Sequence, residues 1–185
     1  KDFSHLRWVR PNRGVLSSVV VKSQLLTPRG LELMVWITSG FCLFAETVAV
    51  QEFADWSERD YGRPRRNAKR GMLPPKLART MINLLALKPE GALLDPFCGS
   101  GTILIEAEVL GWKKIIGADL AKEAISDTEK NINWAKENLT HGNFESRLIV
   151  SPVSKLKSIL TPESVQAIVT EPYLGEPLRG AVRIN

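Results

Sequence analysis

Short apolar runs alternate with amphipathic stretches through the second half of the chain. The runs predict four strands, at residues 92–94, 114–118, 147–150 and 165–170. A helical pattern runs from Thr102 through Glu106 and Leu110, and a longer one covers residues 121–139. Because short turns separate these elements, we predict a doubly wound, mostly parallel α/β sheet from about residue 75 onward.

Helical spacing predicts which faces of the helices are buried. A helix beginning at Pro75 would bury an apolar stripe of Leu77, Met81, Leu84 and Leu85. The helix over residues 121–139 would bury Ile125, Thr128, Ile132 and Ala135. Asn131, Asn133 and Trp134 are expected at the surface or at the edge of the interface.

The first 55 residues are expected to form a small β-rich segment. Residues 15–22 are rich in Val and predict a strand, while residues 31–38 and 41–50 predict a hairpin around Thr38-Ser39-Gly40. A turn is expected at residues 27–30. We therefore divide the chain into this segment (1–55), a basic linker (56–74) and an α/β domain (75–185).

A glycine turn joins a predicted strand to a predicted helix in the stretch Leu93-Leu94-Asp95-Pro96-Phe97-Cys98-Gly99-Ser100-Gly101-Thr102. Such a turn is typical of nucleotide-binding sheets, and its glycines let a ligand approach the main chain. Leu104 stands where the dinucleotide fingerprint needs a third glycine, and no Gly-Lys-Ser/Thr follows for a P-loop. The alternative is a plain α/β turn that binds no cofactor.

Asp119 follows Asp95 by 24 residues, at the end of the next predicted strand. An acid at this place binds the two hydroxyls of a ribose in nucleotide-binding sheets. A carboxylate accepts both hydroxyl hydrogens, so we predict a ribose-binding role. The alternative is an acid that only precedes a helix.

A basic segment, WSERDYGRPRRNAKRGMLPP, occupies residues 56–75. Its glycines and prolines make a regular element improbable. Trp56 and Tyr61 offer planes for a stacked base, and we predict contact with nucleic acid. The alternative is a solvated linker. The residues predicted to contact nucleic acid are Arg59, Tyr61, Arg63, Arg65, Arg66, Lys69 and Arg70.

The composition is that of a soluble globular protein, with 44% hydrophobic and 24% charged residues among 185, and a net charge of +5. No apolar stretch predicts a transmembrane span, and the N-terminus lacks the apolar core of a signal peptide. The two cysteines lie far apart, so neither zinc nor any other metal is expected, and a cytoplasmic location is the default. The chain does not begin with Met, so we expect a piece of a longer protein. The oligomeric state is left open.

Four stretches carry a resemblance to a known family: Arg59-Asp60-Tyr61-Gly62-Arg63-Pro64, Gly71-Met72-Leu73-Pro74-Pro75-Lys76-Leu77-Ala78, Asp95 to Thr102, and Ile116-Gly117-Ala118-Asp119. From about residue 48 to residue 175 the chain resembles RNA guanine-N2-methyltransferases, in particular tRNA enzymes with a THUMP domain. The resemblance implies a Rossmann-like domain dependent on S-adenosylmethionine. Because such sheets have about seven strands, we expect this one to be incomplete at its C-terminal end.

The resemblance also implies roles for individual residues. Asp95, Phe97, Gly99, Gly101 and Thr102 would bind the methionine part of the cofactor, Asp119 its ribose, and Pro74 to Lys76 would border the pocket. Glu171, Pro172 and Tyr173 would receive the target base amine and stack on the base.

The chain departs from the family pattern at two places. The family run is Asp/Asn-Pro-Pro-Tyr/Phe, whereas this chain has Glu171-Pro172-Tyr173-Leu174, and it has no acid near Ser151 or Pro152 to receive the adenine amine. Two alternatives to tRNA methylation therefore stay open. One is a catalytically degenerate module that binds RNA or cofactor, and the other is an amino-methyltransferase acting on rRNA or DNA.

Overall fold

The structure is a computed structural model that describes residues 7, 9–10, 14–66, 72–140, 143–172 and 175. The chain divides into two compact units, residues 1–55 and 56–185. Each unit is described by itself. The division into three functional parts stays a prediction.

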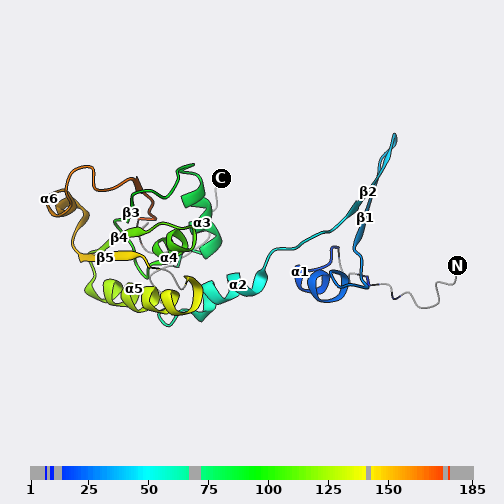
Figure 1. The fold of residues 1–185 in the computed structure, drawn as a ribbon, viewed down its shortest axis with the longest axis horizontal. Helices are drawn as coiled ribbons and strands as arrows, with labels where there is room; N and C mark the ends of the chain where they lie inside the picture. The colour runs from blue at the N-terminus through cyan, green and yellow to red at the C-terminus, as the bar shows by residue number, and fades with distance from the viewer. Residues whose placement is uncertain are drawn as a thin grey trace, which may run out of the picture. The chain divides into compact units, whose positions relative to one another are not determined.

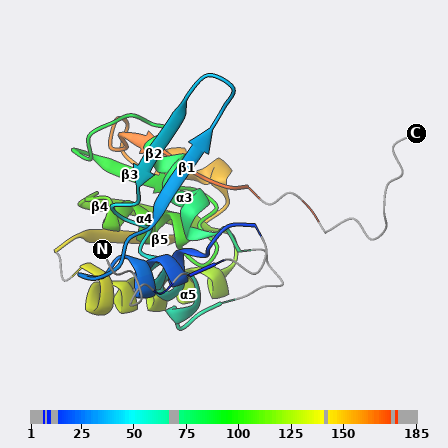
Figure 2. The same ribbon diagram turned by 90° about the vertical axis from the view of Figure 1, so that its right-hand side faces the viewer.

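The first unit contains two short helical segments and a hairpin. The helical segments are α1 (Ser18–Val20) and the π-helix η1 (Val21–Leu25). Strands β1 (Leu33–Ile37) and β2 (Cys42–Glu46) pair antiparallel, with Leu33 opposite Glu46 and Ile37 opposite Cys42 (Figures 1 and 2). The predicted hairpin is confirmed, and Gly30 N–H donates to the Thr27 carbonyl in the predicted turn.

The strand predicted over residues 15–22 is wrong. Ser17 caps a helix there, because its hydroxyl accepts a hydrogen bond from Val20 N–H at 3.4 Å. The Val-rich run has a high strand propensity, but strand propensity depends on a neighbouring strand to pack against. The local cap decides the outcome here.

The second unit is built on a four-stranded parallel sheet in the order β5-β4-β3-β6. This confirms the predicted Rossmann-like parallel sheet (Figure 1). Its strands are β3 (Ala92–Asp95), β4 (Lys114–Asp119), β5 (Glu145–Val150) and β6 (Ala167–Ile168). Around them stand α3 (Pro75–Asn83), α4 (Thr102–Val109), α5 (Lys122–Ala135), η4 (Lys136–Thr140), η5 (Val153–Lys155) and α6 (Leu156–Ile159).

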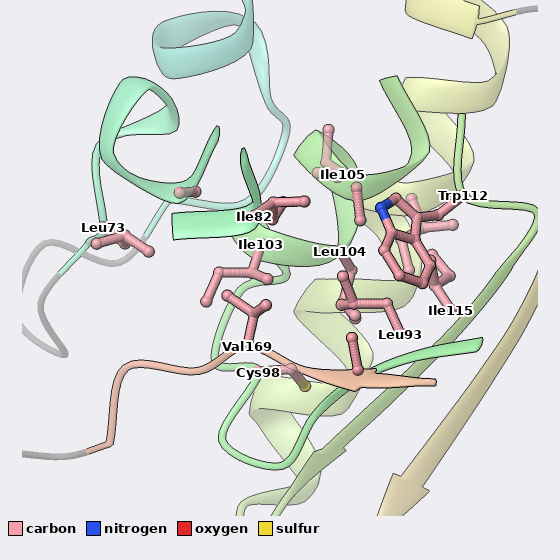
Figure 3. Packing of buried hydrophobic residues seen from close by; sticks show 14 of the residues in the cluster. Leu73, Ile82, Leu93, Cys98, Ile103, Leu104, Ile105, Trp112, Ile115 and Val169 are labelled. Atoms are coloured by element: carbon pink, nitrogen blue, oxygen red, sulfur yellow. The ribbon is translucent and has the colours of Figure 1, made fainter. Parts of the chain in front are cut away.

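The larger hydrophobic core lies on one side of the sheet. Leu93 and Ile115 pack there against Leu104 of α4 and the ring of Trp112 (Figure 3). Alternate strand residues belong to a second, smaller cluster of Ala92, Leu94 and Ile116, as the two-residue period of a strand requires. A Cβ on Gly117 would lie 2.6 Å from Leu104 Cδ1, so α4 packs tightly on β4 at this position.

Two predictions about helix faces are wrong in part. Met81 and Leu85 pack against the core as predicted, and Ala78 and Ile82 of α3 are buried. Leu77 and Leu84 of the predicted stripe are exposed, and Leu84 lies beyond the end of the helix at Asn83. In α5, Asn131 is fully buried instead of lying at the surface. In the described residues, no helix combines the length and the apolar character that a membrane crossing requires.

The sheet order creates a place where the chain changes direction. From β3 the chain proceeds to β4 and β5 on one side, and then returns to β6 on the other side of β3. Ligands of open α/β sheets bind at the carboxyl ends of the strands that flank such a switch point. Asp95 ends β3, and Thr170 follows β6 at the same edge.

Candidate active site

The glycine loop after β3 is a tight turn in which the two glycines have different surroundings. Gly101 N–H donates to the Cys98 carbonyl at 2.7 Å, and both Gly99 and Gly101 have positive φ, of 53° and 84°. A Cβ on Gly101 would lie 2.9 Å from Thr128 Cγ2, whereas a Cβ on Gly99 would meet nothing within 4 Å. Gly101 is thus required because α5 leaves no room for a side chain at this position. Of the two glycines, only Gly99 faces open space, as expected of a glycine that faces a ligand.

Helix α5 holds the loop through two buried side chains that the sequence had not singled out as functional. Thr128 Oγ1 donates to the Gly99 carbonyl at 2.8 Å, and Asn131 Nδ2 donates to the Ser100 carbonyl at 2.9 Å. Residues 128, 131 and 135 follow the i, i+3, i+7 spacing of one helix face. This spacing was the signal that could have found Asn131.

Asp119 ends β4 and touches the loop. Its Oδ2 accepts from Gly99 N–H at 3.1 Å, and its Oδ1 accepts from Ala121 N–H at 2.8 Å. The second bond is the one an acid before a helix makes, but the first ties the carboxylate to the glycine turn. A carboxylate has about four lone-pair positions, so acceptors are left for two hydroxyls.

Asp95 is 2% exposed at the switch point. Its Oδ1 accepts from Phe97 N–H at 3.1 Å and from the Thr170 hydroxyl at 2.6 Å. Burial raises the pKa of Asp95 to about 6; the two hydrogen bonds oppose this rise, and the charges of Asp119 and Glu171 add to it. Three carboxyl groups thus share one edge of the sheet, a setting that favours a positively charged ligand.

The other predicted site residues that the structure describes are exposed to different degrees. Phe97 is partly exposed, and Glu171 and Pro172 are exposed after β6, whereas Tyr173 lies outside the described residues. Pro74 and Lys76 are exposed at the start of α3, with the Lys76 ammonium 5.6 Å from the Trp56 ring centroid.

The basic segment is more regular and more buried than expected. The prediction of an irregular segment is wrong for residues 56–62, which lie in α2 (Phe53–Ser57) and the π-helix η2 (Glu58–Gly62). Arg59 is 7% exposed, and its Nε lies 2.8 Å from Glu106 Oε1 of α4. Arg63 is 3% exposed and donates from Nη1 to the Thr102 hydroxyl at 2.6 Å.

These contacts show how the side chains of Arg59, Arg63 and Thr102 are held in the folded chain, while their roles in binding nucleic acid or cofactor stay predictions. Burial lowers the pKa of Arg63, and its guanidinium faces the protein interior instead of an outside polyanion. The hydroxyl of Thr102 accepts a hydrogen bond from Arg63, which fixes the position of its oxygen at the start of α4.

Of the residues predicted to contact nucleic acid, Tyr61, Arg65 and Arg66 are exposed in the described part of the segment, and we call these three the basic surface. Tyr61 is 65% exposed, and the Arg66 guanidinium stacks over its ring at 4.6 Å. Arg65 Nε lies 3.8 Å from Asp127 of α5, a long ion pair that leaves the guanidinium accessible. Lys69 and Arg70 lie outside the described residues.

A cavity of about 280 Å³ lies at the opposite edge of the sheet, where β4 and β5 begin. Its lining includes Glu108, Trp112 and Phe144. The carboxyl ends of the strands, where the acids and the glycine loop meet, are the chemically better candidate. Within the described ranges no cluster of His, Cys, Asp or Glu could hold a metal ion.

A parallel sheet with a glycine loop after its first strand and acids at two strand ends defines the class of Rossmann-like, S-adenosylmethionine-dependent methyltransferases. The family model described as "RMKL-like, methyltransferase domain" matches residues 63–183, and the chain belongs to this family.

Two curated relatives agree with this assignment, and a solved structure shows the same fold. The chain is 38% identical over 105 residues to a tRNA (guanine(10)-N2)-dimethyltransferase of Methanothermobacter thermautotrophicus, an alignment that covers 57% of this chain and 28% of the relative. It is 35% identical over 139 residues to the enzyme of the same name from Methanocaldococcus jannaschii, covering 72% and 39%. The chain therefore spans well under half of either relative. The structure of TrmN from Thermus thermophilus matches with a TM-score of 0.50 at 22% identity, over 80% of this chain and 41% of that one.

Proposed function

We propose that this chain is part of an enzyme that transfers a methyl group from S-adenosylmethionine to the exocyclic N2 amine of guanine in RNA, with tRNA as the substrate. The observation that carries the proposal is the meeting of Asp95, Asp119 and the open Gly99 turn at the switch point, with Glu171 beside them. Family membership and the names of the two relatives support it. A tRNA enzyme would act in the cytoplasm.

The glycine loop and the neighbouring acids fit the cofactor. Asp95, Phe97, Gly99 and Gly101 would hold its methionine part, Asp119 its ribose, and Pro74 and Lys76 would border it. When bound, S-adenosylmethionine supplies an electrophilic methyl group on a positively charged sulfur. The carboxyl groups of Asp95, Asp119 and Glu171 would favour that positive charge over a neutral ligand.

Glu171, Pro172 and Tyr173 would receive the base. The amine of guanine is a weak nucleophile because its lone pair is delocalised into the ring, so orientation matters more than activation. The Glu171 carboxylate and the main-chain carbonyl of Pro172 would each accept an N–H hydrogen bond from the amine. As the methyl group moves from the sulfur to the nitrogen and S-adenosylhomocysteine leaves, Glu171 would take the proton that the amine loses. Tyr173 would stack on a base flipped out of the RNA.

The basic surface would contact the RNA backbone. Tyr61, Arg65 and Arg66 are exposed. Lys69 and Arg70 lie outside the described residues, and their contact with RNA stays a prediction. Arg59 and Arg63 would act indirectly, because their buried side chains anchor the segment to α4.

The test is methyl transfer from tritiated S-adenosylmethionine by the complete protein to unmodified tRNA, rRNA or DNA, followed by nucleoside analysis. We expect N2-methylated guanosine in tRNA. Glu171→Ala should reduce kcat about a hundredfold while changing the affinity for S-adenosylhomocysteine little. Full activity of Glu171→Ala would contradict the role of Glu171, and methylation of rRNA or DNA instead of tRNA would replace the substrate.

A second candidate is a degenerate module that binds cofactor or RNA without catalysis. Glu171 is one methylene longer than the family's Asp, and the aromatic residue comes one position early. Calorimetric binding of S-adenosylhomocysteine with no transfer to any of the three nucleic acids would favour this candidate.

A further inference from the structure

The side-chain amide of Asn131 joins two segments that are far apart in the sequence. Its Oδ1 accepts from Arg65 N–H at 2.9 Å, and its Nδ2 donates to the Arg65 carbonyl at 2.8 Å and to the Ser100 carbonyl at 2.9 Å. Three of the four hydrogen-bonding positions of the amide are therefore used by main chain. A flipped amide would place its oxygen against two carbonyls, so the network fixes the orientation.

The two joined segments are the two functional parts of the domain. Ser100 stands between Gly99 and Gly101 in the glycine loop, and Arg65 stands within the basic surface. Asn131 itself is fully buried in α5. Its influence on either site would act through main-chain position alone.

Neighbouring contacts strengthen the connection. One turn earlier on α5, Thr128 holds the Gly99 carbonyl, so α5 fixes two successive residues of the loop. Two residues before Arg65, Arg63 binds the Thr102 hydroxyl at the start of α4. A shift of the glycine loop would therefore change the main-chain position of residues 63–65, because Thr102 and Asn131 connect the two segments.

We propose that Asn131 is a positioning residue that couples the glycine loop to the basic surface, so that cofactor occupancy orders the main chain at Arg65. This rests on the proposed function, because it takes the loop as the cofactor site and the basic surface as the RNA site. Linkage makes the coupling reciprocal: RNA tightens cofactor binding by the same factor by which cofactor tightens RNA binding.

The direct test is hydrogen exchange of the complete protein with and without S-adenosylhomocysteine. We expect the cofactor product to slow exchange at residues 61–66, including the Arg65 N–H that donates to Asn131. Asn131→Asp has nearly the same size and keeps Oδ1, but places a second oxygen against the carbonyls of Arg65 and Ser100. In this variant the protection of residues 61–66 should disappear while that of the glycine loop persists.

Asn133→Asp is the matched control, because it makes the same charge change at an exposed position of the same helix. It should behave as the unmodified protein does. Protection of residues 61–66 that persists in Asn131→Asp, or that is absent from the unmodified protein despite cofactor binding, would overturn the coupling. The second observation needs no variant, so it decides the matter even if Asn131→Asp does not fold.

A binding measurement separates coupling from a merely structural role. The affinity for S-adenosylhomocysteine is measured with and without an unmodified tRNA transcript. We expect RNA to tighten it about fivefold or more, and the ratio to fall toward one in Asn131→Asp. A purely structural Asn131 would weaken both affinities and leave their ratio unchanged. No binding of S-adenosylhomocysteine would remove the proposed function as well, whereas binding with a ratio of one in the unmodified protein would remove the coupling alone.

Discussion

Among single residues, Gly99 and Gly101 show how similar glycines of one loop can be required for different reasons. Both have positive φ, which strains any residue with a Cβ. Only at Gly101 would the Cβ also collide with the protein, at Thr128 Cγ2. Substitution at the two positions should therefore separate folding from ligand binding.

We expect Gly101→Ala to lower the free energy of unfolding by about 2–4 kcal/mol, from left-handed strain together with overpacking. Gly99→Ala should cost only about 1–2 kcal/mol, yet weaken S-adenosylhomocysteine binding, since its Cβ would enter the open space of the turn. Urea unfolding and calorimetry measure the two effects. Thr128→Ser removes Cγ2, so it should reduce the cost of Gly101→Ala; an unchanged cost in that background would contradict the clash.

The pKa of Asp95 makes a second residue-scale prediction. Its folded-state pKa, about 6, lies above its ordinary value of 3.8. The unfolded chain therefore loses this proton first as pH rises, and the stability contributed by the protonated carboxyl is lost between about pH 4 and pH 6. The size of the loss is on the order of 3 kcal/mol.

Asp95→Asn keeps an oxygen for Phe97 N–H and Thr170 but cannot ionise. Relative to this variant, the unmodified protein should lose stability as pH rises from about 4 to about 6. Urea unfolding at several pH values measures the difference. Parallel stability curves for the two proteins would show that the pKa of Asp95 is not raised.

At the scale of elements, a buried ion network anchors the basic segment to the domain. Glu106 of α4 is 1% exposed, and its two oxygens face Arg59 at 2.8 Å and Arg79 of α3 at 3.0 Å. The ring of Trp56 lies 4.2 Å from the Arg59 guanidinium. Burial raises the pKa of Glu106, and the two arginines oppose that rise. The Glu106 carboxylate therefore links the basic segment and α3 to α4.

Replacing Glu106 by Gln keeps its shape but leaves two largely buried guanidinium groups without a counter-charge. We expect the free energy of unfolding to fall by about 3 kcal/mol, as for other broken buried ion pairs. Glu129→Gln, on the exposed face of α5, is the control and should cost less than about 0.5 kcal/mol. Equal unfolding curves for both variants would show that the network contributes nothing.

The sequence predicts a structural feature well when the interactions that form it lie between residues close together in the chain. The strands and the glycine loop follow from neighbouring residues, so the predicted strands at 92–94 and 114–118 and the turn at Gly99 agree with β3, β4 and the loop between β3 and α4. The burial of Arg59 was not, because its partner Glu106 lies in another element, and a charge run alone resembles a solvated surface. Asn131 was expected at the surface or at the edge of the interface because its side chain is polar. Its spacing from Thr128 nevertheless places it on the buried face of α5.

At the scale of the whole molecule, the positive charge of the basic segment divides into interior and exterior parts. Arg65 and Arg66 are exposed, whereas Arg59 and Arg63 are buried. Four arginines within eight positions should therefore contribute unequally to binding a polyanion, although sequence alone treats them as equivalent.

We expect Arg65→Gln and Arg66→Gln each to weaken tRNA binding and to reduce the slope of log affinity against log salt by about one. Arg63→Gln should leave the slope unchanged but lower stability, because it removes a buried hydrogen bond to Thr102, and thermal unfolding records that effect separately. Filter binding between low and moderate salt measures the slopes. A smaller slope for Arg63→Gln alone would place that guanidinium, and not the exposed pair, on the phosphates.

The two thiols differ as sharply as the arginines do. Cys98 is buried beside Thr128 in the glycine loop, and burial raises its pKa to about 12, whereas Cys42 is exposed in β2. Thiolate is the reactive form, so a maleimide should modify one cysteine in the folded chain and two after unfolding, as mass spectrometry would show. Rapid double labelling of the folded protein would contradict this. The chain thus offers Cys42, in its first unit, as a single attachment site for a reporter group in the folded protein, without removal of any native cysteine.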